Sequence, residues 1–270
     1  MQKKYLLFLT SLFFLSGCGP VSISFSGPEG TRAVIGNHIE RRLPSYVSRR
    51  EWKDPDTGAS ATFLVARLDP AAWTWDLAQD VEQPKTPREW RDVLGASLVI
   101  NGSYFTASGT PSGFYQNFPT TPKSAIPWPN TSARANESGY TGVVRLVGGN
   151  IHLSYLPKEE ISLKTTDQLF LTYPTLLFGG AALIEKDSGL TARRTVLAED
   201  VTGVTYIIVT EGGLISLHDL AAWLVEQPEA FTIAVNLDGG PSTGLALKDG
   251  DAAIDTSLAA VPNVVVGRRK

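Results

Sequence analysis

Cysteine is nearly absent from this chain, since Cys18 is the only one in 270 residues. A single thiol excludes an intramolecular disulfide and any metal site built from several cysteines. Histidine is almost as rare: only His38, His152 and His218 occur, and they lie far apart in the sequence. Because their spacing matches no histidine metal-binding motif, the sequence predicts no histidine-based metal site.

The sequence also has no excess of basic residues and few of the motifs that mark common enzyme classes. Its formal net charge is −3, whereas proteins that bind nucleic acid normally carry a basic face, so no nucleic-acid partner is expected. It contains neither a Gly-x-Ser-x-Gly elbow nor a Walker loop, which argues against serine hydrolases and nucleotide triphosphatases. Hydrophobic residues make up 43% and charged residues 19%, the balance of a folded globular protein.

The first residues have the pattern of an export signal. Lys3 and Lys4 precede an apolar run, Tyr5–Leu15, which is shorter than the roughly 20 residues that span a bilayer. The run ends in Leu-Ser-Gly-Cys18, a sequence that resembles the lipobox of bacterial lipoproteins. We therefore expect residues 1–17 to be a lipoprotein signal peptide and Cys18 to be lipidated; an ordinary signal peptide with a chance cysteine is the alternative.

This interpretation predicts where the protein works and how its domain is attached. The lipid on Cys18 would anchor it to a membrane of the bacterial cell envelope, on the extracytoplasmic side. Gly19 fits sorting to the outer membrane where the source has two membranes. Residues 18–34 are rich in Gly, Pro and Ser and are expected to form a lipidated tether. Residues 35–270 would then form the folded domain.

The pattern of that domain favours the α+β class. We expect a single domain with a mixed, largely antiparallel β-sheet core and a few helices. Ala61–Leu68 and Trp73–Leu77 are interpreted as a hairpin that turns at Asp69-Pro70. Helices are expected at Thr86–Leu94 and from Leu217 to about Gln227, with Thr86 and Ser216 as N-caps. Further strands are expected at 97–100, 142–147, 151–155, 169–173, 194–198, 205–209, 231–235 and 263–266.

A long segment without a helix or strand pattern interrupts these elements. Residues 106–141 are rich in Pro, Ser, Thr, Gly and Asn, with several aromatic residues among them. Loops of this length are uncommon inside compact domains and often have a function. We interpret the segment as a lid or binding loop, with an insertion of no function as the alternative.

The chemistry points to the loop at residues 236–243, which follows a β-rich run. Gly239 and Gly240 permit a tight turn and close approach of a ligand. They would present Asp238 at the end of a strand, with Ser242 nearby. A carboxylate flanked by hydroxyls suits binding of sugar hydroxyls or phosphate oxygens, or acid–base chemistry on them. Taken alone, however, Asp-Gly-Gly is also a common β-turn.

A series of short motifs, in order along the chain, favours a functional loop over a simple β-turn. They are Leu98-Val99-Ile100-Asn101-Gly102-Ser103-Tyr104-Phe105, Pro111-Ser112-Gly113-Phe114, Tyr173-Pro174-Thr175-Leu176-Leu177, Arg193-Arg194-Thr195-Val196, Leu217-His218-Asp219-Leu220-Ala221 and Val235-Asn236-Leu237-Asp238-Gly239-Gly240-Pro241-Ser242-Thr243. Each is weak alone, but together and in this order they resemble the phosphodiester glycosidase family over roughly residues 60–270.

The resemblance implies site residues and roles. Asp238 would be the general acid/base or would orient water at the anomeric carbon, and Arg194 would bind the phosphate with its planar guanidinium. Asn101 would complete the catalytic set by a hydrogen bond to sugar or phosphate, unless it only forms a turn at a strand end. The substrate-binding residues implied are Thr195, Gly239, Gly240, Ser242, Tyr104 and Gly113. Arg193 is expected to be a solvated neighbour.

Two positions depart from the family pattern. Pro241 stands where the family usually has Gly, and Gly244 stands where it has a second Ser or Thr. Proline removes a backbone N–H, so the anion-binding geometry after Asp238 is open to change. A second carboxylate is also hard to find. Glu211 is the nearest candidate, with a turn as its alternative role, although a phosphate leaves as an anion and one carboxylate would suffice.

These observations predict an extracytoplasmic lipoprotein hydrolase. Its substrate would be a sugar-1-phosphodiester or a related glycosidic link in an envelope or extracellular polysaccharide, bound as a carbohydrate or sugar-phosphate partner. No cofactor is expected. Two alternatives stay open: a non-catalytic saccharide-binding lipoprotein on the same scaffold, and a metal-assisted phosphodiesterase with a divalent metal at Asp238.

Overall fold

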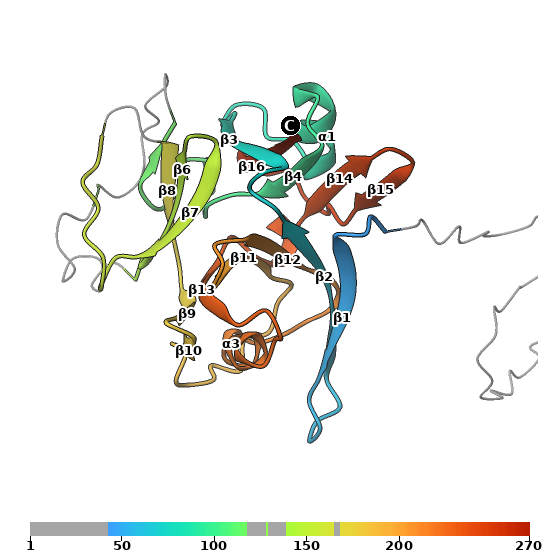
Figure 1. Ribbon diagram of the computed structural model, residues 1–270, viewed down its shortest axis with the longest axis vertical. Helices are drawn as coiled ribbons and strands as arrows, with labels where there is room; N and C mark the ends of the chain where they lie inside the picture. The colour runs from blue at the N-terminus through green and yellow to red at the C-terminus, as the bar shows by residue number, and fades with distance from the viewer. Residues whose placement is uncertain (1–42, 118–127, 129–138, 165–167) are drawn as a thin grey trace, which may run out of the picture. The chain divides into compact units, whose positions relative to one another are not determined.

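Three β-sheets and two α-helices form the described part of the chain (Figure 1). The computed structural model describes residues 43–117, 128, 139–164 and 168–270. All strand pairs within these residues are antiparallel, which confirms the expected largely antiparallel α+β fold. The signal peptide, Cys18, the tether and the domain start at residue 35 lie outside the described residues and stay predictions.

The largest sheet has seven strands and carries helix α3 on one face. Its order is β1 (Val47–Lys53), β2 (Ser60–Leu68), β12 (Thr205–Gly213), β11 (Thr195–Asp200), β13 (Phe231–Asn236), β9 (Thr175–Phe178) and β10 (Ala181–Ala182). Helix α3 (Leu217–Val225) packs on this sheet through Trp223, whose ring lies 4.6 Å from that of Phe63. The buried apolar residues of the helix and of the sheet face beneath it form one continuous cluster.

A five-stranded sheet carries the other helix. Its order is β15 (Ala252–Asp255), β14 (Leu245–Asp249), β4 (Leu98–Asn101), β16 (Asn263–Arg269) and β3 (Trp73–Gln79). Helix α1 (Pro87–Leu94) is fixed to the sheet by Trp90, whose indole N–H donates to the carbonyl of Val261 over 2.9 Å. Strand β4 lies between β14 and β16, so both of its edges are paired.

A four-stranded sheet completes the core. Its order is β5 (Tyr115–Gln116), β8 (Gln168–Thr172), β6 (Gly142–Val147) and β7 (Asn150–Tyr155), and Figure 1 shows it beside β3. One large apolar cluster takes side chains from all three sheets, among them Leu64, Ile100 and Phe170. The sheets therefore share a core, and residues far apart in sequence meet at their edges.

The two expected helices begin at the predicted caps. Thr86 and Glu89 form a capping box around the start of α1, with Pro87 in its first turn. Ser216 caps α3 by accepting the backbone N–H of Asp219. The expected strands are present as well, and each is extended or shifted at its ends by a few residues at most.

The predicted hairpin of 61–68 with 73–77 is wrong. The chain does turn at Asp69, whose carbonyl accepts the N–H of Ala72, but the two strands then enter different sheets. Both edges of β2 are occupied, by β1 and β12, so no edge is left for β3. Strand β3 instead pairs with β16 along its whole length.

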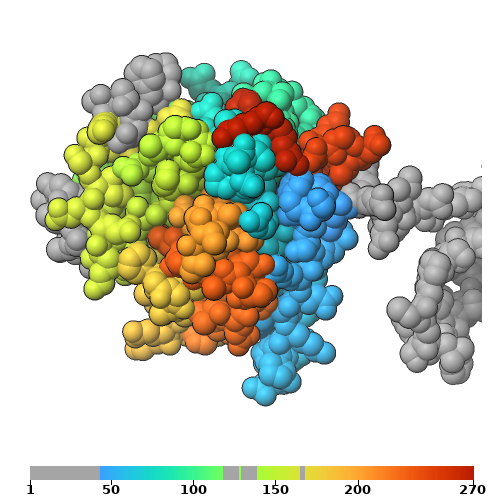
Figure 2. All heavy atoms as spheres, viewed as in Figure 1, coloured from blue at the N-terminus to red at the C-terminus, as the bar shows by residue number. Residues whose placement is uncertain are grey.

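The β1–β2 hairpin was not expected from the sequence. Its tip projects beyond the strands that flank it (Figure 2), and residues 55–60 are exposed. Much of the predicted loop at 106–141 lies outside the described residues, namely 118–127 and 129–138. In the parts of the chain that the structure describes, no helix has the length and apolar character needed to cross a membrane.

The contact between β7 and β11 generates a stability prediction. Glu199 of β11 accepts the N–H of Leu153 over 2.9 Å, and burial raises its pKa to about 7, with Glu159 and Asp200 adding to the shift. Between the pKa of Glu199 in the unfolded chain and its higher pKa in the folded protein, the folded protein binds more protons. Its stability therefore falls as the pH rises through this range.

We expect Glu199→Gln, which keeps the acceptor and removes the charge, to gain stability over the wild type as the pH rises from about 5 to about 8. Thermal unfolding followed by circular dichroism across this range measures the difference. A gap between the two melting temperatures that does not widen with pH would contradict the assignment.

Candidate functional site

The predicted site residues lie where the ends of β4, β11 and β13 meet. The β4 strand ends at Asn101, β11 begins at Thr195, and β13 ends at Asn236, just before Asp238. Because β11 and β13 are antiparallel neighbours, Arg194 and the loop after β13 lie at the same end of the sheet. The fold therefore gathers motifs that the sequence separates, with 137 positions between Asn101 and Asp238.

Asn101 connects these strand ends with its side chain. Its Nδ2 donates to the carbonyl of Asp238 over 2.7 Å, and its Oδ1 accepts from Thr195 Oγ1 over 2.7 Å and from the N–H of Gly244 over 3.1 Å. Asn101 and Thr195 are both fully buried. We infer that they position the loop from behind, and do not contact a substrate directly.

Asp238 is held in a partly buried position above this network. Its Oδ1 accepts the N–H of Gly239 over 2.9 Å, and its carboxylate also accepts from the hydroxyl of Ser242. Burial raises the pKa of Asp238 above its usual value, against the lowering effect of these two hydrogen bonds. Asp238 forms no ion pair with any residue that the structure describes.

Arg194 lies beside the same loop. Its Nε donates to the carbonyl of Ile215 over 3.2 Å and its Nη2 to that of Leu190 over 3.0 Å. Its Nη1 would lie 3.8 Å from a Cβ atom at Gly239, so this nitrogen faces the loop that carries Asp238. Burial lowers the pKa of Arg194 below its usual value. Within the described residues no carboxylate pairs with this guanidinium.

Arg193 is not the solvated neighbour that the sequence suggested. Its Nη2 bridges the carbonyls of Thr210, at 3.1 Å, and Thr256, at 2.9 Å. Its Nε and Nη1 are buried and have no hydrogen-bond partner in the described structure. Its backbone carbonyl accepts the N–H of Gly240. Arg193 therefore ties β12 and the segment after β15 to the Asp238 loop.

The two glycines of the loop serve its packing. A Cβ atom at Gly239 would lie 3.0 Å from the carbonyl of Arg193, and Gly240 has a φ of +61°. Their N–H groups are used inside the protein, by Asp238 and Arg193 respectively. A phosphate at this loop would therefore be bound mainly by side chains.

The two departures from the family pattern have local physical reasons. Pro241 lies at the start of a 3-10 turn, Gly240–Ser242, where a missing N–H costs no hydrogen bond. At Gly244, a Cβ atom would lie 2.8 Å from Pro87 of α1. A Ser or Thr at this position would therefore require α1 to move.

Tyr104 contacts the site from the segment after β4. Its hydroxyl oxygen accepts from Asn236 Nδ2 over 2.5 Å. Burial raises the pKa of Tyr104, and the negative charge of Asp238 adds to this while Arg194 opposes it. The phenol is therefore neutral and its own proton is free to donate toward the site. Asn236 is fully buried and was not among the predicted site residues.

Two further tyrosines surround Tyr104. The ring of Tyr173 lies 4.7 Å from that of Tyr104, and the ring of Tyr140 lies 5.1 Å from that of Tyr173. Gly113 makes room for this group, since a Cβ atom there would lie 2.9 Å from the Tyr140 ring. No local sequence pattern indicated the contacts of Tyr140 and Tyr173, because the three rings come together from separate segments of the chain.

Glu211 does not supply a second carboxylate. It lies within β12 and not in a turn. Its two carboxylate oxygens accept from Arg49 Nε over 2.7 Å and Arg49 Nη2 over 2.9 Å. This bidentate pair connects β1 with β12. Asp238 is therefore the only one of the two predicted carboxylates that belongs to the loop after β13.

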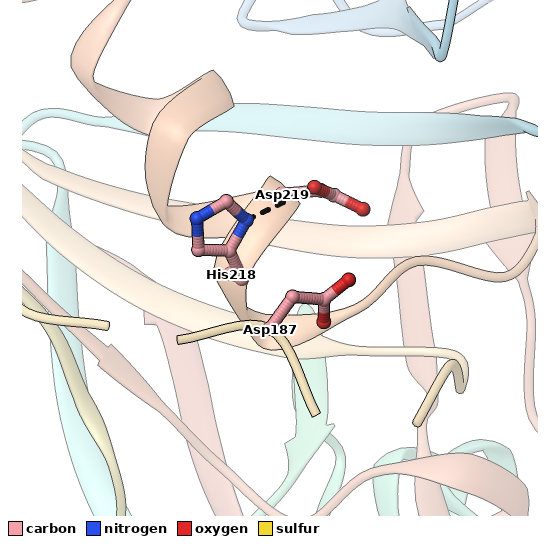
Figure 3. Close-up of side chains that lie close together, drawn as sticks. All are labelled: Asp187, His218 and Asp219. Atoms are coloured by element: carbon pink, nitrogen blue, oxygen red, sulfur yellow. Dashed lines mark hydrogen bonds and ion pairs between the residues drawn. The ribbon is translucent and has the colours of Figure 1, made fainter. Parts of the chain in front are cut away.

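One group of possible metal ligands in the described residues does not include Asp238. Asp187, His218 and Asp219 bring one ligand atom each to within 4.8 Å of one another (Figure 3). His218 and Asp219 are neighbours at the start of α3, and Asp219 also accepts from the N-cap hydroxyl of Ser216 over 2.9 Å. Helix capping thus accounts for the position of Asp219, and the sequence had not suggested this grouping.

A cavity of about 190 Å³ lies at another part of the seven-stranded sheet. Its charged lining residues include Arg50 and Glu229, which pair with each other. It also contains Tyr206, whose hydroxyl donates to Asp200. None of the predicted site residues lines this cavity, so it does not bear on the Asp238 site.

The Asn101 network leads to a prediction about stability. Asn101→Ala removes three hydrogen bonds and leaves the Thr195 hydroxyl buried without its acceptor, so we expect the free energy of unfolding to fall by about 2–3 kcal/mol. Urea unfolding measures this. Thr86→Ala, which removes the cap of α1 and none of the hydrogen bonds of Asn101, serves as the control and should cost about 1 kcal/mol. A loss for Asn101→Ala no larger than that of the control would contradict the role of the network.

Comparison with known proteins gives the family and a related fold. The family model described as phosphodiester glycosidase matches residues 94–266. Among solved structures, the chain is similar to the catalytic domain of zebrafish N-acetylglucosamine-1-phosphodiester alpha-N-acetylglucosaminidase, auto-inhibited by its pro-peptide. The identity is 15%, the TM-score is 0.59, and the match covers 84% of this chain and 85% of that one.

A protein of Synechocystis is 14% identical, with a TM-score of 0.49, over 83% of this chain and 62% of that one. The comparison with curated proteins gives no match. The family model spans more than half of the chain and includes Asn101, Arg194 and Asp238. This chain therefore belongs to the phosphodiester glycosidase family.

Proposed function

We propose that this protein hydrolyses sugar-1-phosphodiesters at Asp238 and Arg194. The observation that carries the proposal is a pair of charged groups without ion-pair partners, one on the loop after β13 and one beside it. The Asp238 carboxylate and the Arg194 guanidinium are partly buried, and neither forms an ion pair with a described residue. Burying charges without partners is costly, and such groups are common at functional sites. A phosphate ligand would supply the missing counter-charge for Arg194.

The reaction needs few protein groups. Water attacks the anomeric carbon and gives its proton to Asp238, while the bond between that carbon and the phosphate oxygen breaks. The electron pair of that bond leaves with the phosphate, which departs as a monoester. Arg194 Nη1 neutralises the phosphate, and the Tyr104 hydroxyl donates to an oxygen of the substrate. Since phosphate is a good leaving group, no second carboxylate is required.

Family membership supports a glycosidase-like role and a carbohydrate or phosphosugar substrate. The zebrafish relative is named for N-acetylglucosamine-1-phosphodiesters, so these are the first substrates to test. We further propose that the protein acts as a lipoprotein on envelope or extracellular polysaccharide. This rests on the signal-like first residues and the lipobox at Cys18. Mass spectrometry of the membrane fraction tests the anchor, because Cys18→Ser should release the protein.

The competing function is a saccharide-binding lipoprotein without turnover. The exposed residue Tyr173, whose ring packs on that of Tyr104, favours it, because aromatic rings bind sugars without any catalytic group. Release of reducing sugar from a panel of UDP-sugars and sugar phosphodiesters decides between the two. Sugar binding without release would support the binding protein. Loss of release on addition of a chelator would instead support the metal-assisted alternative at Asp238.

Replacement of Asp238 tests the proposed base. Asp238→Asn keeps the size and the hydrogen bonds of the loop but cannot accept a proton, so we expect at least about a 100-fold loss of kcat with an unchanged melting temperature. Because burial raises the pKa of Asp238, wild-type kcat should rise with pH through a value above that of an exposed aspartate. A variant that keeps near-wild-type kcat would show that Asp238 is not the base.

Replacement of Arg194 tests the phosphate ligand. Arg194→Ala should lower kcat/KM by about 100-fold or more, because the developing phosphate charge loses its partner. Arg194→Lys keeps the charge but not the planar fork and should recover only part of the rate. Arg268 on β16 provides the control, because its partly exposed side chain pairs with Asp76 and not with a site residue. Arg268→Ala should leave kcat/KM unchanged. Equal rates for the Arg194→Ala and wild-type proteins would contradict the assignment.

A further inference from the structure

Tyr173 is an aromatic residue that neighbouring rings hold in place while part of its surface stays exposed to solvent. It follows β8 and has 41% of its surface exposed, which places it among the few large apolar side chains that reach solvent in the described structure. Its backbone carbonyl accepts from Asn236 Nδ2 over 3.3 Å. The chain at Tyr173 is thus fixed to the end of β13, directly before the Asp238 loop.

Two neighbouring rings fix the orientation of the Tyr173 ring. Tyr104 lies 4.7 Å away at an interplanar angle of 33°, and Tyr140 lies 5.1 Å away at 62°, in an edge-on arrangement. Contacts of this kind favour one orientation of an aromatic ring. The ring of Tyr173 therefore has little freedom to lose when a ligand packs on it, which favours binding.

The position of this ring relative to the charged groups suggests which part of a substrate it contacts. The phenols of Tyr104 and Tyr173 both raise the pKa of Arg194, and Asp238 raises those of Tyr104 and Tyr140. Tyr104 therefore lies near both charged groups, Tyr173 near Arg194 and Tyr140 near Asp238. A phosphate at Arg194 would leave its sugar next to Asp238 and over the aromatic group.

We propose that Tyr173 is the platform of a sugar subsite, on which the C–H face of a pyranose ring stacks, with Tyr104 and Tyr140 as its supports. This inference rests on the proposed function, because it places the sugar of the phosphodiester between Tyr173 and Asp238. Pyranose rings present C–H groups on their faces and hydroxyls at their edges. Such rings match an aromatic face beside a carboxylate and a neutral phenol that donates a hydrogen bond.

Tyr173→Leu removes the aromatic face and keeps an apolar side chain, whereas Tyr173→Phe keeps the face and removes the hydroxyl. With UDP-N-acetylglucosamine as substrate, Tyr173→Leu should raise KM by about fivefold with kcat within about twofold, because stacking acts equally in the ground and transition states. Tyr173→Phe should stay near the wild type. Tyr155→Leu is the matched control, since Tyr155 packs on Phe178, and should leave KM unchanged.

A binding measurement separates this inference from the proposed function. Saturation-transfer NMR with methyl N-acetyl-α-glucosaminide should give strong signals from the ring C–H protons with the wild type and weak ones with Tyr173→Leu. Binding that is lost in this variant supports the subsite even if the wild type releases no sugar from any phosphodiester, a result that would overturn the proposed function alone. Hydrolysis by the wild type with unchanged KM and unchanged NMR signals in Tyr173→Leu would overturn the subsite alone.

Discussion

The hydrogen bonds of the Asn101 side chain are the constraint on which the rest of the site depends. One amide binds the carbonyl of Asp238, the hydroxyl of Thr195 and the N–H of Gly244, and it does so with no exposed surface. In this environment each unmade bond would leave a buried polar group without a partner. The loop after β13 is therefore held at a fixed position relative to β4 and β11, and with it the direction of the Asp238 carboxylate.

Around this fixed loop, the polar groups and the charged groups differ in the partners that they have within the protein. Asn101, Thr195 and the N–H groups of the two glycines all have hydrogen-bond partners within the protein. Asp238 and Arg194 also form hydrogen bonds, but neither has an ion-pair partner among the described residues. Protein structures rarely leave such groups unpaired without a reason. The asymmetry separates the residues that build the loop from the residues that are available to a ligand.

The sequence predicted the elements better than their partners. Helix caps at Thr86 and Ser216 are local signals, because a cap is a bond between residues three positions apart, and both helices begin where expected. Sheet membership is not local. The chain turns at Asp69 as predicted, but whether β3 pairs with β2 depends on β1 and β12, which occupy the edges of β2.

The same distinction holds for the site. Asp238, Arg194 and Asn101 were identified from ordered motifs, and the structure places them together. The pairing of Glu211 with Arg49, the burial of Arg193 and the grouping of Tyr104 with Tyr140 and Tyr173 were not foreseen. Each depends on side chains that meet across 33 or more positions or on the solvent exposure of individual atoms. No pattern in the neighbouring residues encodes such information.

The position of β4 between β14 and β16 has a consequence for the order of assembly. Asn101 comes from the first half of the chain, but the strands on both sides of it are made from residues 245–249 and 263–269. Contacts of such long range form slowly, because a large loop of chain must close first. A chain still emerging from a ribosome therefore cannot complete this sheet until residues 263–269 are free, and until then the strand that carries Asn101 lacks a partner on one side.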